Sequence, residues 1–399
     1  DHTEAGGVHG PHQRQADIAQ ADNTDGCRAT RKLLYQRGRV FVHQWVQGNL
    51  VQERPVRSGF EAGGTGAFCR QESHLSSQRM TPELTVSGML IKPRSEGGIE
   101  LGEGTIRIKG DRIVSIDARM TSRPDLGGPG YLISPGFVDA HLHLPQFDSI
   151  GVAGLELLDW LETVIFPAEA RWGDTGFARE MSRRVGHQLL RAGTTSIAAY
   201  ATSHAAATQA AADVLGGLGF SGHVGHVLMD QNGPSNLLVE ADKAIADCRG
   251  LLAAGRVQPS INPRFAVACS MELMQAAAGL AGDTGWRIQT HLAETIAEIE
   301  AVRRIYGMGY VETYDRAGLL RAGALFAHGI HLSADDRSRL EGRGCIIAHC
   351  PTANRFLRAG SMNWDATAAS GVRVALGSDV AGGPDRCMVR VARGMLEND

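Results

Sequence analysis

Two histidines separated by a single residue, His141 and His143, lie in the segment 134–146, which reads SPGFVDAHLHLPQ. The sequence predicts a buried strand over 136–142, and the two-residue period of a strand sends both imidazoles to the same face. Neutral imidazole is the commonest zinc ligand among side chains, and an open catalytic zinc site takes about three protein ligands plus a water. The pair therefore predicts a metal site whose other ligands come from later in the chain.

The elements that must position these ligands follow from the hydrophobic pattern after the His-x-His strand. Further strands are predicted at 194–200, 222–229, 260–267, 286–291, 324–328, 345–349 and 373–377. Helices are predicted at 155–165, 178–191, 205–218, 237–253, 271–281, 296–306, 334–341 and 367–370. Strands that alternate with helices pair in parallel, and eight such strands close a barrel. We therefore predict an α/β protein with a TIM (β/α)8 barrel.

Chemistry in such barrels sits at the C-terminal ends of the strands, and four later residues meet this condition. His291 ends the fifth predicted strand, His328 ends the sixth, and Asp379 follows the eighth. Glu294 lies three residues after His291, where a general acid or base can stand beside a metal without binding it. All these side chains are expected at the same end of the barrel as the two histidines of the first strand.

We interpret this cluster as a hydrolytic site with one Zn²⁺ per chain. The predicted metal ligands are His141, His143, His291 and Asp379. Bound zinc lowers the pKa of water from about 15.7 to about 7, which makes a hydroxide available. Glu294 and Asp379 are predicted to transfer protons, and His328 to orient the nucleophile or polarise the electrophile. Because Zn, Fe and Mn compete for His/Asp sites according to availability, the residues alone leave the identity of the metal open.

The regions before the barrel differ from it, and from each other, in hydrophobic pattern. Residues 1–79 show no sustained hydrophobic period apart from 39–46, so we expect a disordered or non-native extension, with a regulatory extension as the alternative. Residues 80–133 contain short alternating strands at 84–91, 104–109 and 112–116, with a hairpin turn at Gly110-Asp111, and predict a small flanking β-sandwich domain. Residues 134–399 are assigned to the barrel. Little sequence follows Asp379, so we expect the C-terminal part to be truncated, with no strands left to pair with the small domain.

Composition limits the partners. The formal net charge of −3 shows no basic excess, so neither nucleic acid nor an anionic membrane surface is an expected partner. No apolar run is long enough to cross a bilayer, and the seven cysteines are scattered without CxxC spacing. We therefore expect a cytoplasmic protein with reduced thiols that acts on a small neutral molecule.

The motifs PGFVDAHLH, HLAE, AHG, AHCP and GSDVAGG, in that order, resemble the amidohydrolase superfamily. More locally, HLPQ, LLDWLETVIFPAEARW, YATSHAAAT, PRF and DVAGG resemble the guanine deaminases within it. The resemblance covers Met80 to the end of the chain. In the segment HCPTANRFLRAG, Ala353 and Arg355 stand where that family more usually has Ser and an apolar residue.

This resemblance implies a TIM barrel with a flanking β-sandwich, one zinc, a homodimer, and hydrolytic deamination of guanine to xanthine and ammonia. It places the metal ligands at His141, His143, His291 and Asp379 and the proton-transferring Glu at Glu294. It also matches His328 to an additional active-site His. It also implies purine contacts from Gln146, Arg264 and Phe265. These residue types suit purine binding, since an arginine can donate to the O6/N7 edge of guanine and an aromatic ring can pack on its face.

Two alternatives stay open at this stage. One is another aminohydrolase or chlorohydrolase of the same superfamily, acting on an oxidised purine such as 8-oxoguanine, an adenosine-like molecule or a triazine. The other is a non-catalytic barrel or an inactive truncated fragment. A panel of substrates distinguishes the first alternative from guanine deamination. Soluble expression with metal analysis distinguishes the second alternative from a folded, metal-binding enzyme.

Overall fold

A computed structural model describes residues 40–44, 83–94 and 97–398. The chain divides into two compact units, one that ends at Pro135 and one that begins at Gly136. Within the described ranges, no helix combines the length and the apolar character needed to cross a membrane. Apart from Val40–Gln44, the prediction made for residues 1–79 lies outside the described residues.

The first unit contains a five-stranded sheet in the order β1-β5-β2-β3-β4. Its strands are β1 (Val40–Gln44), β2 (Glu83–Pro93), β3 (Ile99–Lys109), β4 (Arg112–Asp117) and β5 (Leu126–Pro135). The predicted hairpin turn is confirmed, because Lys109 pairs with Arg112 across a Gly110 with φ of +62°. Over the described residues, the strands predicted for the small β-domain are thus present, and they belong to one sheet.

Strand β5 has no counterpart in the prediction because glycines interrupt its sequence. It runs parallel to β2 and antiparallel to β1. Gly127 has φ of +87°, and a Cβ there would lie 2.0 Å from the carbonyl oxygen of Ser87. This close approach of two backbones requires a glycine. The glycine interrupts the alternation of apolar and polar residues from which a strand is predicted.

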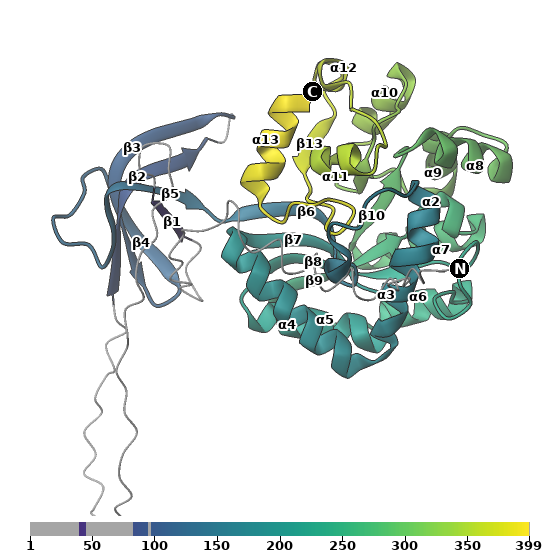
Figure 1. The fold of residues 1–399 in the computed structure, drawn as a ribbon, viewed down its shortest axis with the longest axis horizontal. Coiled ribbons are helices and arrows are strands. Elements are labelled where there is room, and N and C mark those ends of the chain that lie inside the picture. Colours follow the sequence, from purple (N-terminus) through teal and green to yellow (C-terminus); the bar gives the residue numbers. More distant parts are fainter. Residues whose placement is uncertain (1–39, 45–82, 95–96, 399) are drawn as a thin grey trace, which may run out of the picture. The chain divides into compact units, whose positions relative to one another are not determined.

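The second unit is built on eight parallel strands that follow chain order around the sheet. They are β6 (Phe137–His143), β7 (Thr194–Tyr200), β8 (Ser221–Leu228), β9 (Arg256–Pro263), β10 (Arg287–Leu292), β11 (Leu325–His328), β12 (Ile346–His349) and β13 (Arg373–Leu376). Helices lie around these strands (Figure 1). The predicted TIM barrel is confirmed, with each of its eight strands present.

Helical segments connect the strands. The α-helices are α2 (Leu157–Trp160), α3 (Phe166–Ala170), α4 (Thr175–Ala192), α5 (Ala205–Gly217), α6 (Ala241–Arg249), α7 (Met271–Thr284), α8 (Ile296–Tyr306), α9 (Tyr310–Ala317), α10 (Ala334–Gly342), α11 (Pro351–Phe356), α12 (Trp364–Ala369) and α13 (Met388–Asn398). Shorter segments are the π-helical η2 (Leu161–Ile165) and the 3₁₀ turns η1 (Phe147–Ser149), η3 (Arg171–Gly173) and η4 (Ala266–Ala268). The single helix predicted at 155–165 is instead split, because a π-helical turn interrupts it.

Helix α4 shows how the sequence builds the outer layer. It begins after Asp174, whose carboxylate accepts hydrogen bonds from the first free backbone N–H groups, and it ends at Gly193 with φ of +93°. Its buried apolar residues recur every three or four positions, which is the spacing of one helix face: Ala178, Met181, Val185 and Leu189. This face packs on the barrel together with residues of β6 and β7.

The ring of strands closes beside the predicted site. The backbone N–H of Asp379 donates to the carbonyl oxygen of His141 at 2.8 Å. The buried carboxylate of Asp139 accepts a hydrogen bond from the backbone N–H of Ser378 at 2.9 Å and another from the Ser378 hydroxyl. These contacts hold β6 against the segment that follows β13, and so hold the predicted ligands of both segments in place.

Candidate active site

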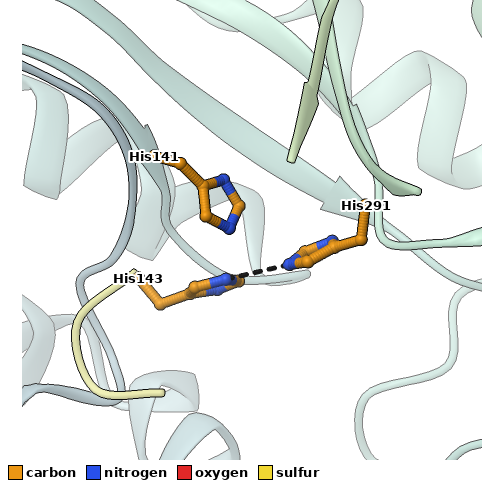
Figure 2. Close-up of side chains that lie close together, drawn as sticks. All are labelled: His141, His143 and His291. Carbon is orange, nitrogen blue, oxygen red and sulfur yellow. Dashed lines mark hydrogen bonds between the residues drawn. The ribbon is translucent and has the colours of Figure 1, made fainter. Parts of the chain in front are cut away.

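Three of the predicted ligands converge from two strands. His141 and His143 project from β6, and His291 projects from β10. The Nε2 atoms of His143 and His291 lie 3.0 Å apart, and each of the three rings offers a nitrogen within 4.8 Å of the others. Figure 2 shows the three imidazoles turned towards a common space. The expected placement of His141 and His143 on one face of a strand is present.

Asp379 brings a carboxylate to the same cluster. Its Oδ1 lies 3.3 Å from Nε2 of His141 and 3.5 Å from Nε2 of His143. Its backbone has φ of +46°, a conformation that costs energy and is held here by the hydrogen bond to β6. A second group of potential ligands overlaps the first, because His141, His328 and Asp379 also bring their atoms within 4.8 Å.

The chemistry of the imidazoles fits a metal. Nδ1 of His291 donates a hydrogen bond to the carbonyl oxygen of Arg264, so the proton stays on Nδ1 and Nε2 keeps a free lone pair. Nε2 of His141 is buried and has no hydrogen-bond partner in the described part of the chain. Burial is the largest cause that lowers the pKa of His141, His143 and His291 well below the usual range, which keeps them neutral. Two nitrogens bound to one zinc at about 2.0–2.1 Å stand about 3 Å apart, as two of these do.

Glu294 and His328 lie next to this cluster. Oε2 of Glu294 is 3.5 Å from Nε2 of His328, while its buried Oε1 has no hydrogen-bond partner among the described residues. Burial is the largest cause that raises the pKa of Glu294 well above its usual range, and the charges of Asp379 and Glu298 raise it further. Burial also raises the pKa of Asp379 to about 6. A cation in the cluster would lower both pKa values.

The predicted substrate contacts line one small cavity with these groups. This cavity has a volume of about 30 Å³, and its lining includes His143, Gln146, Arg264, Phe265, His291, Glu294, His328 and Asp379. Such a volume holds about one water molecule, so a purine base can enter only if part of the lining moves. A neighbouring cavity of about 740 Å³ shares Leu161 and Phe265 with it. These two side chains therefore lie at the boundary of both cavities.

Four buried polar residues without a predicted role support the site: Asp139, Glu169, Glu298 and Asn354. Glu169 contacts both Gln146 and Arg264. The carboxylate of Glu298 accepts from the backbone N–H of Glu294 at 2.9 Å, and the amide oxygen of Asn354 lies 2.9 Å from Nδ1 of His328. A signal for Glu298 exists in the sequence, because Thr295-Ile-Ala-Glu298 is a capping box, which the structure forms.

Comparison with known proteins extends these observations. A sequence profile of the Amidohydrolase family matches residues 132–397, a span that includes every barrel strand and the whole histidine cluster. This chain belongs to the amidohydrolase family. The resemblance inferred from PGFVDAHLH, HLAE and GSDVAGG is therefore confirmed.

Several curated relatives of this amidohydrolase are guanine deaminases. The protein of Dictyostelium discoideum is 34% identical over 279 residues, which cover 68% of this chain and 62% of the relative. The Escherichia coli (strain K12) protein is 36% identical over 262 residues, which cover 64% and 60%. The Homo sapiens protein is 35% identical over 269 residues, which cover 65% and 59%. The chain thus spans about three fifths of the length of these relatives.

Solved structures of similar fold include further guanine deaminases. The enzyme from C. acetobutylicum, with guanine bound in its active site, has a TM-score of 0.75 at 29% identity over 79% of each chain. The E. coli enzyme has a TM-score of 0.73 at 30% identity over 79% of this chain and 78% of its own. A triazine hydrolase has a TM-score of 0.65 at 20% identity over 76% of this chain and 73% of its own, a likeness of fold alone.

Proposed function

We propose that this amidohydrolase catalyses the hydrolytic deamination of guanine to xanthine and ammonia. The observation that carries the proposal is a buried cluster of neutral histidines and carboxylates that shares one cavity with Gln146 and Arg264. The similarity to guanine deaminases, one of them solved with guanine bound, supports guanine as the substrate.

The metal proposed for this reaction is one Zn²⁺, held by His141, His143, His291 and Asp379. Bound zinc would lower the pKa of a water to about 7 and so supply hydroxide at neutral pH. His291 suits the ligand role better than His328, because its Nε2 lies 3.0 Å from Nε2 of His143, close enough for both to bind one ion. Nε2 of His328 lies instead beside the carboxylate of Glu294.

The residues of this chain then bind the base and move protons. Arg264 and Gln146 hold the hydrogen-bonding edge of guanine, and Phe265 packs against the ring. As the oxygen of the attacking water bonds to C2, Glu294 gives a proton to the adjacent ring nitrogen. Asp379 takes one proton of the attacking water and passes it to the departing amine, which leaves as ammonia. The proton of the hydroxyl group at C2 returns to Glu294 as the C2 carbonyl of xanthine forms. His328, 3.5 Å from Glu294 and 3.9 Å from Asp379, orients the two carboxylates.

The test is ammonia release by the full chain supplied with Zn²⁺. Guanine is compared with adenine, cytosine, 8-oxoguanine and a triazine, before and after treatment with a chelator. The proposal expects release from guanine that is lost on chelation and restored by zinc. Release from one of the other amines alone would refute guanine as the substrate. Light scattering and metal analysis of the same sample test the predicted homodimer and the single zinc per chain, and cell fractionation tests the cytoplasmic location.

A further inference from the structure

Glu169 joins the two polar residues that are proposed to hold the base. It lies in α3 and is 3% exposed, behind the site cavity rather than in its lining. Its Oε1 accepts a hydrogen bond from Nε2 of Gln146 at 2.8 Å, and its Oε2 forms an ion pair with Nη1 of Arg264. One buried carboxylate therefore restrains a residue that follows β6 and a residue that follows β9.

The first consequence concerns the amide of Gln146. A carboxylate offers acceptors only, so the NH₂ group of Gln146 must face Glu169 for the pair to form a hydrogen bond. Rotating the amide by half a turn would place two oxygens against each other inside a buried site, which is unfavourable. Glu169 thus leaves Oε1 as the acceptor that Gln146 can offer to a ligand.

The second consequence concerns the guanidinium of Arg264. Its charge is buried, with 2% of the residue exposed, and the carboxylate of Glu169 compensates it. The ring of Phe166, three residues before Glu169, lies 5.1 Å from the guanidinium carbon and covers one face. Helix α3 therefore fixes the arginine by charge and by packing, and leaves its remaining N–H groups as donors.

We propose that Glu169 is a positioning residue that makes the site select a 6-oxopurine over a 6-aminopurine. Guanine presents a carbonyl oxygen at C6 beside an N1–H, an acceptor beside a donor. This edge complements an arginine donor beside a glutamine acceptor. 2,6-Diaminopurine keeps the same amine at C2 but reverses the edge, with an amino donor at C6 beside an unprotonated N1. The inference rests on the proposed function, since it concerns how guanine is recognised.

The substitution Glu169→Gln removes this restraint without changing the size of the side chain. In Glu169→Gln one of the two oxygens becomes an NH₂ group, so the atom that faces Gln146 and the atom that faces Arg264 can no longer both be acceptors. The amide of Gln146 can then turn and offer its NH₂ group to the ligand. One mismatched hydrogen bond in a buried site changes affinity by about tenfold or more. We expect the affinity ratio of guanine to 2,6-diaminopurine to fall by at least about tenfold.

The experiment measures binding rather than turnover. Metal-depleted protein is equilibrated by dialysis against micromolar radiolabelled guanine or 2,6-diaminopurine, because the hydrolysis proposed here needs the metal. Glu162→Gln serves as the matched control, since Glu162 is an exposed acid in the same segment and loses the same charge. Near-UV circular dichroism verifies the fold of each variant. If Glu169→Gln does not fold, Glu169→Asp keeps the charge beside Arg264 but is too short to hold both partners, and is measured instead.

The outcomes distinguish this inference from the function on which it rests. A ratio that falls in the Glu169 variant and stays constant in Glu162→Gln supports the positioning role. A wild-type protein that binds guanine, together with a Glu169 variant that keeps the wild-type ratio, would overturn the role of Glu169 and leave the substrate standing. A wild-type protein that binds neither base would overturn the proposed substrate as well.

Discussion

Replacing Asp139 tests how the barrel closes beneath the candidate metal site. The side chain is fully buried, and its Oδ1 accepts hydrogen bonds from the backbone N–H groups of Ser378, at 2.9 Å, and His141, at 3.3 Å. Its Oδ2 accepts the hydroxyl proton of Ser378. We expect Asp139→Asn to be mild and Asp139→Ala to be severe, because the two variants remove different parts of this arrangement.

The magnitudes follow from the contacts. In Asp139→Asn the amide oxygen keeps both backbone hydrogen bonds, and the NH₂ group donates to the Ser378 hydroxyl, which can turn to accept. The loss is at most the added strength of charge-assisted bonds, about 1 kcal/mol, because the neutral amide also avoids the cost of burying the charge, which raises the pKa of Asp139 to about 7. In Asp139→Ala three buried donors lose their acceptor, at about 1–3 kcal/mol each, so the loss is at least about 3 kcal/mol. At about 2–4 °C per kcal/mol for a unit of this size, Tm falls by at most about 4 °C in Asp139→Asn and by at least about 6 °C in Asp139→Ala.

Thermal unfolding followed by circular dichroism, in the presence of a chelator, measures both losses without a contribution from metal. A pH of 8 is suitable, because burial raises the pKa of Asp139 to about 7 and the carboxylate must be ionised. A zinc titration of the folded variants adds a second readout. Since Asp139 supports the backbone of His141 and the residue before Asp379, its removal should weaken zinc binding by about 10–100-fold. Equal melting temperatures for the Asn and Ala variants would refute the reasoning.

Three further predictions concern single side chains. Glu294→Gln should retain zinc but lower ammonia release from guanine by about 10²- to 10⁴-fold, because it removes a proton carrier and no ligand; near-normal turnover would contradict this. Asn354→Ala should lower kcat with unchanged metal content, since His328 loses the oxygen that holds its Nδ1 proton, whereas Asn354→Asp keeps an acceptor and should lose less. Burial lowers the pKa of His226 from its usual value near 6.5 to about 4. As pH falls, the unfolded state therefore binds a proton before the folded state does, and up to about 3 kcal/mol of stability is lost between these two pH values. Urea unfolding of His226→Gln should show a shallower loss, and parallel pH curves for the two proteins would exclude this contribution.

Most of the barrel could be predicted because each strand is a short apolar run between segments of helical period. The errors have local causes. Strand β9 was predicted at 260–267 but ends at Pro263, because the chain leaves the ladder at Arg264 and forms η4. Helices α9 and α11, with 8 and 6 residues, escaped prediction because about two turns contain too few repeats of a 3.6-residue period.

The histidine cluster could be predicted for a different reason. Parallel strands of a barrel end on one rim, so topology alone makes neighbours of residues as distant in sequence as His141 and Asp379. No comparable rule applies to Glu169. It lies in a short helix, and its partners are 23 and 95 residues away. Its place beside Gln146 and Arg264 depends on how the split helical segment packs over the rim, which no periodicity encodes.

Arg264 connects the two halves of the candidate site through different parts of one residue. Its backbone carbonyl fixes the tautomer of His291, while its guanidinium pairs with Glu169 and lines the cavity. The contact to the histidine cluster therefore does not depend on which side chain stands at 264, whereas the proposed recognition of the base does. This separation follows from the barrel itself, since strand ends position backbone and ligands, and the segments above them supply the groups that contact substrate. We therefore expect substitutions at 146, 169 and 264 to change the proposed substrate preference while the histidine cluster of β6 and β10 stays intact.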